Sequence, residues 1–161
     1  MSILLQKQRL IKDNLIKAIT SIKGPEDKKS VQLIDYALQQ ALALKGPLNW
    51  LFYGYGQGET STLGTACIHG YSPLLAIMEL MTQMGRSERI EVYCNKPINE
   101  KGYGPLQAAS KYGHQEIVEF LLKRGASPNY AGDDMHFTPL IMAVRSGHIG
   151  VIKVLLKAGA E

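Results

Sequence analysis

Apolar residues recur at helical spacing twice in the N-terminal part of the chain. The first series is Ile11, Leu15, Ala18, Ile19 and Ile22, and the second is Val31, Ile34, Leu38, Ala41 and Leu42. Each series ends at a Gly-Pro pair, at residues 24–25 and 46–47, and such a pair stops a helix. The pattern therefore predicts a hairpin of two amphipathic helices over residues 1–48.

One sequence pattern occurs twice further along the chain, in residues 103–127 and again in residues 137–161. Ten aligned positions are identical: Pro105/Pro139, Leu106/Leu140, Ala109/Ala143, Gly113/Gly147, His114/His148, Leu121/Leu155, Leu122/Leu156, Lys123/Lys157, Gly125/Gly159 and Ala126/Ala160. Each copy predicts a helical hairpin, because Pro begins the first helix, Gly-His forms the turn and Gly ends the second helix. One hairpin cannot bury its apolar stripe alone, so the copies must stack.

A weaker copy of the pattern occupies residues 61–85. Leu63, Ala66 and Gly70 stand where Leu106, Ala109 and Gly113 stand in the stronger copy, and Ile77, Met78, Leu80 and Met81 supply the second helix. The connection that follows, residues 85–99, is longer than a standard loop between such hairpins. Within it, the alternation in Arg89-Ile-Glu-Val-Tyr-Cys94 predicts a short strand.

The motifs of these copies resemble the ankyrin repeat. They are Thr138-Pro-Leu, Ala-x-x-x-Gly-His, Val/Ile-x-x-Leu-Leu and Gly-Ala-x-x-Asn129. The resemblance is strong over residues 99–161, weak over 61–98 and absent from residues 1–60. It implies an all-α fold, an ankyrin-type solenoid of helical hairpins, with the N-terminal helical hairpin as its cap.

The predicted division of the chain follows the patterns above. It comprises an N-terminal helical hairpin (1–48), an aromatic, glycine-rich loop (49–60), a degenerate ankyrin-like repeat with a long loop (61–98), an ankyrin repeat (99–132) and a C-terminal repeat, complete or truncated (133–161). Val151, Ile152, Leu155 and Leu156 of the last helix are followed by no polar cap. Self-association through that helix is therefore one expectation, and a fragment of a longer array is another.

Composition narrows the class of protein. With 45% apolar and 20% charged residues, and no apolar run near the roughly 18 residues of a membrane span, the chain is typical of a globular protein without a transmembrane segment. The N-terminal apolar stretch is too short for a signal peptide, and Cys67 and Cys94 are too few for a disulfide framework. We expect an intracellular, cytoplasmic protein, in the host cytoplasm if an intracellular bacterium delivers it.

The net charge of +4 does not predict nucleic-acid binding. The excess lies in residues 1–50, where eight Lys and Arg face four Asp and Glu. Seven of these cations, Lys7, Arg9, Lys12, Lys17, Lys23, Lys28 and Lys29, ring the predicted helices rather than forming one stripe, and acidic residues interrupt them. A mostly solvated face is the expected role.

Motifs for catalysis and for cofactors are incomplete. The glycine-rich segment 54–58 lacks the lysine of a phosphate-binding loop, and Cys67 and His69 are spaced to point to different sides of a helix. Ser72 has no nucleophile elbow, and the pair Asp133-Asp134 is ordinary for a loop. His114 and His148 occupy the hairpin turns, where an imidazole can bridge backbone groups of adjacent hairpins. We therefore expect no enzyme, no metal and no cofactor.

The ankyrin resemblance implies a non-catalytic protein–protein interaction module, whose concave surface of loops and first helices binds a partner protein. The positions that make contacts in the family correspond here to Glu100, Lys101, Tyr103, Lys111, Tyr112, Asp134, Met135, Phe137, Arg145 and Ser146. The aromatic members suit rigid anchors and the cations suit carboxylates. In the alternative interpretation, the aromatic rings only cover the bases of the loops.

A second function remains open at this point: the chain could be the substrate-targeting part of a longer effector or enzyme whose catalytic region lies beyond residue 161. The chain also departs from the ankyrin pattern. Gly104 and Gln107 replace its Thr and His, Ile141 replaces the second His, and His136 stands where the turn wants glycine for a positive φ. The hydrogen bonds that fix these turns are therefore not expected, and we predict mobile loops.

Overall fold

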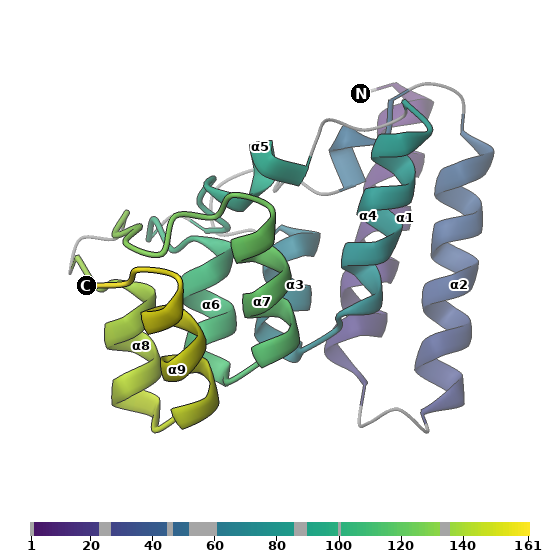
Figure 1. Ribbon diagram of the computed structural model, residues 1–161. Coiled ribbons are helices and arrows are strands. Elements are labelled where there is room, and N and C mark those ends of the chain that lie inside the picture. The colour runs from purple at the N-terminus through teal and green to yellow at the C-terminus, as the bar shows by residue number, and fades with distance from the viewer. Residues whose placement is uncertain are drawn as a thin grey trace.

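The computed structural model describes residues 2–22, 27–44, 47–51, 61–85, 90–99, 101–132 and 136–161. Across these ranges the regular structure is helical, with no strand. Figure 1 shows short helices stacked side by side toward the C-terminus and two longer ones at the N-terminal end. The predicted all-α solenoid is confirmed. The aromatic loop at 52–60 lies outside the described residues.

The N-terminal hairpin consists of α1 (Ile3–Thr20) and α2 (Lys28–Ala43). Side chains begin both helices: Ser2 accepts a hydrogen bond from the backbone N–H of Leu5, and Asp27 accepts one from that of Ser30. Helix α1 contacts both α2 and α3 (Thr62–His69), so the hairpin packs on the first short helix of the stack. The 3-10 helix η1 (Asn49–Leu51) follows the hairpin.

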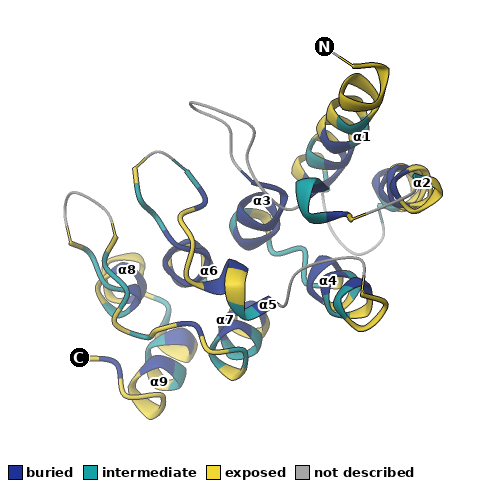
Figure 2. Ribbon diagram, turned by 90° about the horizontal axis from the view of Figure 1, so that it is seen from above, coloured by how far each residue is buried: buried dark blue, intermediate teal, exposed yellow. Residues whose placement is uncertain are grey.

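Three helical hairpins form the rest of the stack. They pair α3 with α4 (Pro73–Gln83), α6 (Pro105–Tyr112) with α7 (Gln115–Lys123), and α8 (Pro139–Ser146) with α9 (Ile149–Lys157). Figure 2 shows two rows: α3, α6 and α8 form one row, and α4, α7 and α9 form the other. We call these the inner row and the outer row.

The predicted strand at residues 89–94 is wrong. The structure forms a short helix there, α5 (Ile90–Cys94), and Arg89 lies outside the described residues. The buried side chains are Ile90, Tyr93 and Cys94, which follow helical spacing, whereas Val92 is 40% exposed. Over so few residues, an apolar pattern fits the two-residue period of a strand and the 3.6-residue period of a helix equally well. The packing of these side chains selects the helix.

Burial corrects one further expectation. Lys12, grouped above with solvated cations, is 1% exposed. It precedes the fully buried Leu15 and Ile19 at helical spacing, on the face of α1 that packs inward. Conversely, Leu80, expected to help form the core of the weaker copy, points outward and is 56% exposed.

Candidate interaction surface

Two histidines join neighbouring hairpins at the turns. The Nε2 atom of His114 lies 2.9 Å from the carbonyl oxygen of Ile68, and that of His148 lies 3.0 Å from the carbonyl oxygen of Lys111. The ring of each His also packs where a Cβ on the glycine that ends the preceding inner helix would stand, Gly70 or Gly113. The bridging role predicted from their place in the pattern is what the structure shows.

Two asparagines form a second set of links, which the sequence pattern revealed only in part. Asn95 donates to the carbonyl of Gly125 at 2.9 Å and accepts from the N–H of Ser127 at 2.8 Å. Asn129, the equivalent position of the next repeat, donates to the carbonyl of Gly159 at 3.3 Å and accepts from the N–H of Glu161 at 2.9 Å. The two asparagines are offset by the same amount as the two copies of the pattern, and this signal could have placed Asn95.

Hydrogen bonds hold the described residues just before α6 and α8, contrary to the expectation from the missing Thr and His. The Gln107 side chain accepts from the N–H of Gly104 at 2.7 Å and donates to the carbonyl of Phe137. Thr138 accepts from the N–H of Ile141 at 3.3 Å and so caps α8. Gln107 therefore bonds to both loops, its own and the next, and the predicted mobility of the loops stays a prediction.

The inner row presents two cation–aromatic pairs among the predicted contact residues. At the end of α6, the Nζ atom of Lys111 lies 5.3 Å from the ring centroid of Tyr112, and both side chains are exposed. At α8, the guanidinium carbon of Arg145 lies 4.9 Å from the ring centroid of the half-buried Phe137. Because α6 packs directly on α8, the two pairs lie on neighbouring repeats.

The other predicted contact residues have different settings. Lys101 and Ser146 are exposed, whereas Tyr103 is half-buried and packs against the core. Glu100, Asp134 and Met135 lie outside the described residues. Tyr103 therefore fits the alternative interpretation, in which an aromatic ring covers the base of its loop.

Tyr130 is a residue of this surface that the sequence pattern did not identify. Its hydroxyl donates to the carbonyl of Gly102 at 3.4 Å, across from one loop to the next. Its ring lies beside Gly104, the glycine that replaces the usual Thr. The glycine in place of Thr was therefore the sequence signal that another side chain occupies the space of the Thr side chain.

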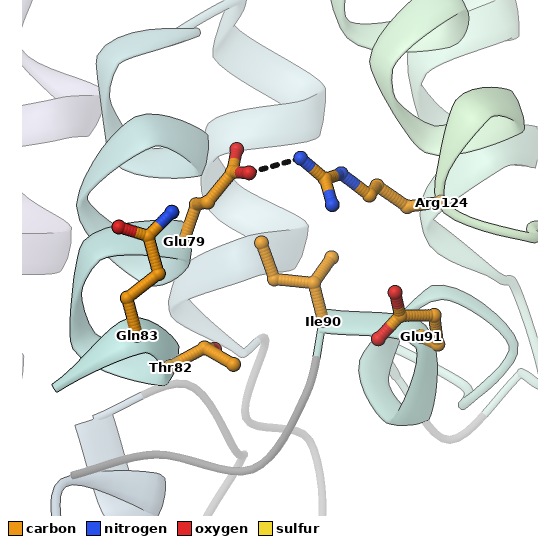
Figure 3. Close-up of a pocket in the computed structure, with 6 residues that line it drawn as sticks. All are labelled: Glu79, Thr82, Gln83, Ile90, Glu91 and Arg124. Atoms are coloured by element: carbon orange, nitrogen blue, oxygen red, sulfur yellow. Dashed lines mark hydrogen bonds and ion pairs between the residues drawn. The ribbon is translucent and has the colours of Figure 1, made fainter. Parts of the chain in front are cut away.

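A pocket of about 160 Å³ lies between the outer row and α5. It is lined by Glu79, Thr82, Gln83, Ile90, Glu91 and Arg124. Figure 3 shows the Arg124 side chain reaching across to the Glu79 carboxylate, with which it forms an ion pair. This pair joins α4 to the end of α7, so the guanidinium already has a structural partner.

Three titratable groups with shifted pKa values, Cys67, Cys94 and Tyr71, are not activated nucleophiles. Burial raises the pKa of the Cys67 thiol well above its ordinary value of 9.0, and the nearby Cys94 raises it further. Burial and Glu91 raise the pKa of Cys94 to about 12, against a smaller lowering by Arg124. Burial and Asp35 likewise raise the pKa of Tyr71. All three groups therefore stay protonated at neutral pH, which is the opposite of the thiolate chemistry of a catalytic cysteine.

The described ranges contain neither a metal-binding cluster nor a membrane-spanning helix. These residues contain no group of three or more His, Cys, Asp or Glu arranged to hold a metal ion. None of the helices in the same ranges combines the length and hydropathy needed to cross a bilayer.

Comparison with known proteins agrees with this architecture. A family model described as ankyrin repeats (3 copies) matches residues 38–132 and 66–161. The first match begins within α2, so it extends into the stretch that showed no resemblance in the sequence pattern. A search of curated proteins finds no match.

Proposed function

Because the chain belongs to the ankyrin repeat family, we propose that it is a non-catalytic module that binds a partner protein through its concave surface. By concave surface we mean the exposed side of α6 and α8 together with the loops before them. The observation that supports this most is the presence of the pairs Lys111/Tyr112 and Arg145/Phe137 on two neighbouring repeats, whose inner helices α6 and α8 are in contact. The free cysteines fit the proposed cytoplasmic location.

The chemistry of these pairs defines the partner they suit. Each pair holds a cation beside an aromatic face, so it offers an apolar contact and a charge at one place. Aromatic and arginine side chains supply most of the binding energy in protein interfaces. The exposed Lys101 adds a third cation. A partner segment that alternates apolar side chains with carboxylates is complementary to this surface.

The test compares two triple variants in a pull-down with quantitative mass spectrometry. The concave-surface variant is Lys111→Glu, Tyr112→Ala, Arg145→Glu, in which every changed side chain is exposed. The matched control carries the same types of change on the outer row, Lys123→Glu, Leu80→Ala, Lys157→Glu, also at exposed positions. Equal net charge and equal helicity by circular dichroism separate a local effect from a global one.

We expect partners that the wild-type chain and the control capture equally and that the concave-surface variant loses. Their dissociation constants, measured with the purified proteins, should rise at least about tenfold in that variant. If both variants retain the same partners, the concave surface is the wrong site. If only the control loses them, the outer row is the binding surface.

A further inference from the structure

The same place is hollowed at both junctions of the outer row, α4 with α7 and α7 with α9. At the first junction this place is the pocket of about 160 Å³ described above. At the second junction it is an open groove of about 400 Å³, which we call the outer groove. The residues that line the outer groove are Glu119, Leu122 and Lys123 of α7 and Val154, Lys157 and Ala158 at the end of α9.

The two sites are equivalent when the outer helices are aligned by their C-terminal ends. Three residues of α4 line the first site, and the three corresponding residues of α7 line the second: Glu79/Glu119, Thr82/Leu122 and Gln83/Lys123. The residue directly after the next outer helix completes each site, Arg124 at the first junction and Ala158 at the second. The difference between the two sites therefore lies in a few substitutions at matching positions.

The exchange of Arg124 for Ala158 opens the second site. At the first junction the Arg124 guanidinium pairs with the Glu79 carboxylate, and its carbon lies 5.5 Å from the centroid of the Phe120 ring. Ala158 has no side chain long enough to reach Glu119, which corresponds to Glu79. The space that an arginine fills at the first junction is therefore open at the second.

The first site also shows what kind of segment covers such a place. Helix α5 lies against it, and Ile90 and Glu91 complete its lining. Ile90 is 3% exposed, and Figure 3 shows its side chain pointing toward the pair of Glu79 and Arg124. The connection after α7 forms no helix in its described residues, 124–132 and 136–138. Within those residues, the outer groove has no counterpart of α5.

Charge distinguishes the outer groove from the first site. Lys123 and Lys157 are exposed, and within the described residues neither lysine lies in an ion pair. Glu119, the one acid of the lining, accepts a hydrogen bond from a side chain of its own helix at 2.9 Å. The half-buried Leu122 and Val154 form the apolar part of the groove. An apolar side chain with a carboxylate next to it is complementary to this arrangement.

We propose that the outer groove binds a segment of a partner protein in which an apolar side chain is followed directly by Glu or Asp. Ile90 and Glu91 of α5 supply this chemistry at the first junction. The apolar side chain lies between Leu122 and Val154, and the carboxylate faces the two lysines.

This surface lies on the outer row, whereas the concave surface belongs to the inner row (Figure 2). The proposal therefore does not rest on the proposed function. A partner of the outer groove is lost with the triple variant that changes Lys123 and Lys157, and a partner of the concave surface is lost with the triple variant that changes Lys111 and Arg145.

The probe is a synthetic peptide, Ser-Gln-Ile-Glu-Gln-Ser, whose ends are blocked so that Glu carries its only charge. One sister peptide has Lys in place of Glu, and another has Ser in place of Ile. Each peptide is titrated into the nitrogen-15-labelled full chain, and the amide chemical shifts report both affinity and location. We expect the Ile-Glu peptide to shift the amides of Leu122, Lys123 and Val154 and to bind at least about fivefold more tightly than either sister.

Two variants locate the binding. Ala158→Arg restores the residue of the first junction and should weaken the Ile-Glu peptide at least about fivefold, because the guanidinium fills the groove and faces Glu119. Lys123→Glu with Lys157→Glu should reverse the preference between the Glu and Lys peptides. Controls with the same changes in charge at exposed positions of α1 and α2 should leave binding unchanged: Gln39→Arg, and Lys7→Glu with Lys17→Glu.

Four outcomes overturn the proposal. The absence of saturable shifts at the groove would show that the Ile-Glu peptide does not bind there. Equal affinity for the Glu and Lys peptides would show that the lysines select nothing. Binding that survives Ala158→Arg would place the peptide elsewhere. A dimer in sedimentation experiments that Ala158→Arg dissociates would show that a second copy, and not a partner segment, covers the outer groove.

Discussion

The phenol ring of Tyr130 stands in the space that a side chain on Gly104 would occupy. A Cβ at Gly104 would lie 2.9 Å from both Cδ1 and Cε1 of that ring, closer than real Cβ contacts allow. The backbone of Gly104 is extended, with φ −86° and ψ 163°, a conformation open to any residue. Glycine is therefore needed for space and not for conformation, which explains why the chain departs from the usual Thr here.

Gly104→Thr should lower the free energy of unfolding by about 1–3 kcal/mol, because the new side chain collides with the Tyr130 ring. In a Tyr130→Ala background the same substitution should cost much less, since the space is free and the Thr hydroxyl can cap α6 as Thr138 caps α8. Urea unfolding of the two single variants and the double variant measures this. Additive effects would show that the two residues do not compete for space.

Ser110→Ala should stabilise the protein by about 1 kcal/mol. The Ser110 hydroxyl is buried between hairpins and has no hydrogen-bond partner, so it carries a desolvation cost that alanine removes. Ser146→Ala, on the exposed side of α8, is the control for the helix propensity of alanine. Thermal unfolding of the two variants separates the removal of the unpaired hydroxyl from the higher helix propensity of alanine. Equal gains in stability would attribute the effect to helix propensity alone.

His136→Gly should also raise the free energy of unfolding, by up to about 1 kcal/mol. His136 has φ 52°, the left-handed region that a residue with a Cβ adopts at a cost and glycine adopts freely. His136→Ala keeps the Cβ and should give no such gain. Chemical denaturation compares the two variants, and a loss of stability in His136→Gly would mean that the imidazole makes contacts worth more than the strain.

Asn95→Ala should destabilise the junction between the α3/α4 hairpin and the α6/α7 hairpin by about 1 kcal/mol, since it removes both hydrogen bonds to the loop after α7. Asn95→Asp keeps the oxygen that accepts from Ser127 and loses the donor to Gly125, so its effect should be intermediate. Amide exchange of Ser127 reports the retained bond directly. Equal protection of that amide in wild type and Asn95→Ala would contradict this assignment.

Alkaline pH should weaken the fold through its buried thiols. The folded pKa of Cys67 is raised above 9.0, so its contribution to stability is complete below that pH and is lost as the pH rises toward the folded pKa. In that window the free energy of unfolding should fall by about 1.4 kcal/mol per pH unit for this fully buried thiol. The free energy of unfolding of wild type and Cys67→Ala, measured between about pH 8 and about pH 10, isolates the contribution of Cys67, because only wild type carries this titration. If the free energies of unfolding of the two proteins changed in parallel with pH, the prediction would be wrong.

Periodic features of the chain were predictable because the repeat specifies them twice. The prolines at the start of α6 and α8, the His bridges at the turns and the glycines after α7 and α9 recur at a fixed spacing, and each has a local physical reason. Features that occur only once were harder to predict. Over residues 90–94 the apolar pattern fits both a strand and a helix, and the burial of Tyr93 and Cys94 shows that the segment is a helix. The inward position of Lys12 likewise depends on which face of α1 meets its neighbours.

The sequence alone determined the architecture: a capped stack of helical hairpins, their order and the glycines that follow α6, α7, α8 and α9. These follow from local propensity and from apolar spacing, which act between residues close in the chain. Only the tertiary structure decided how the surface is arranged. The packing of Tyr130 on Gly104 and the exposure of Val144 where Ser110 is buried join or compare residues from different parts of the stack. Such relationships depend on how hairpins and their loops stack, which no local pattern encodes.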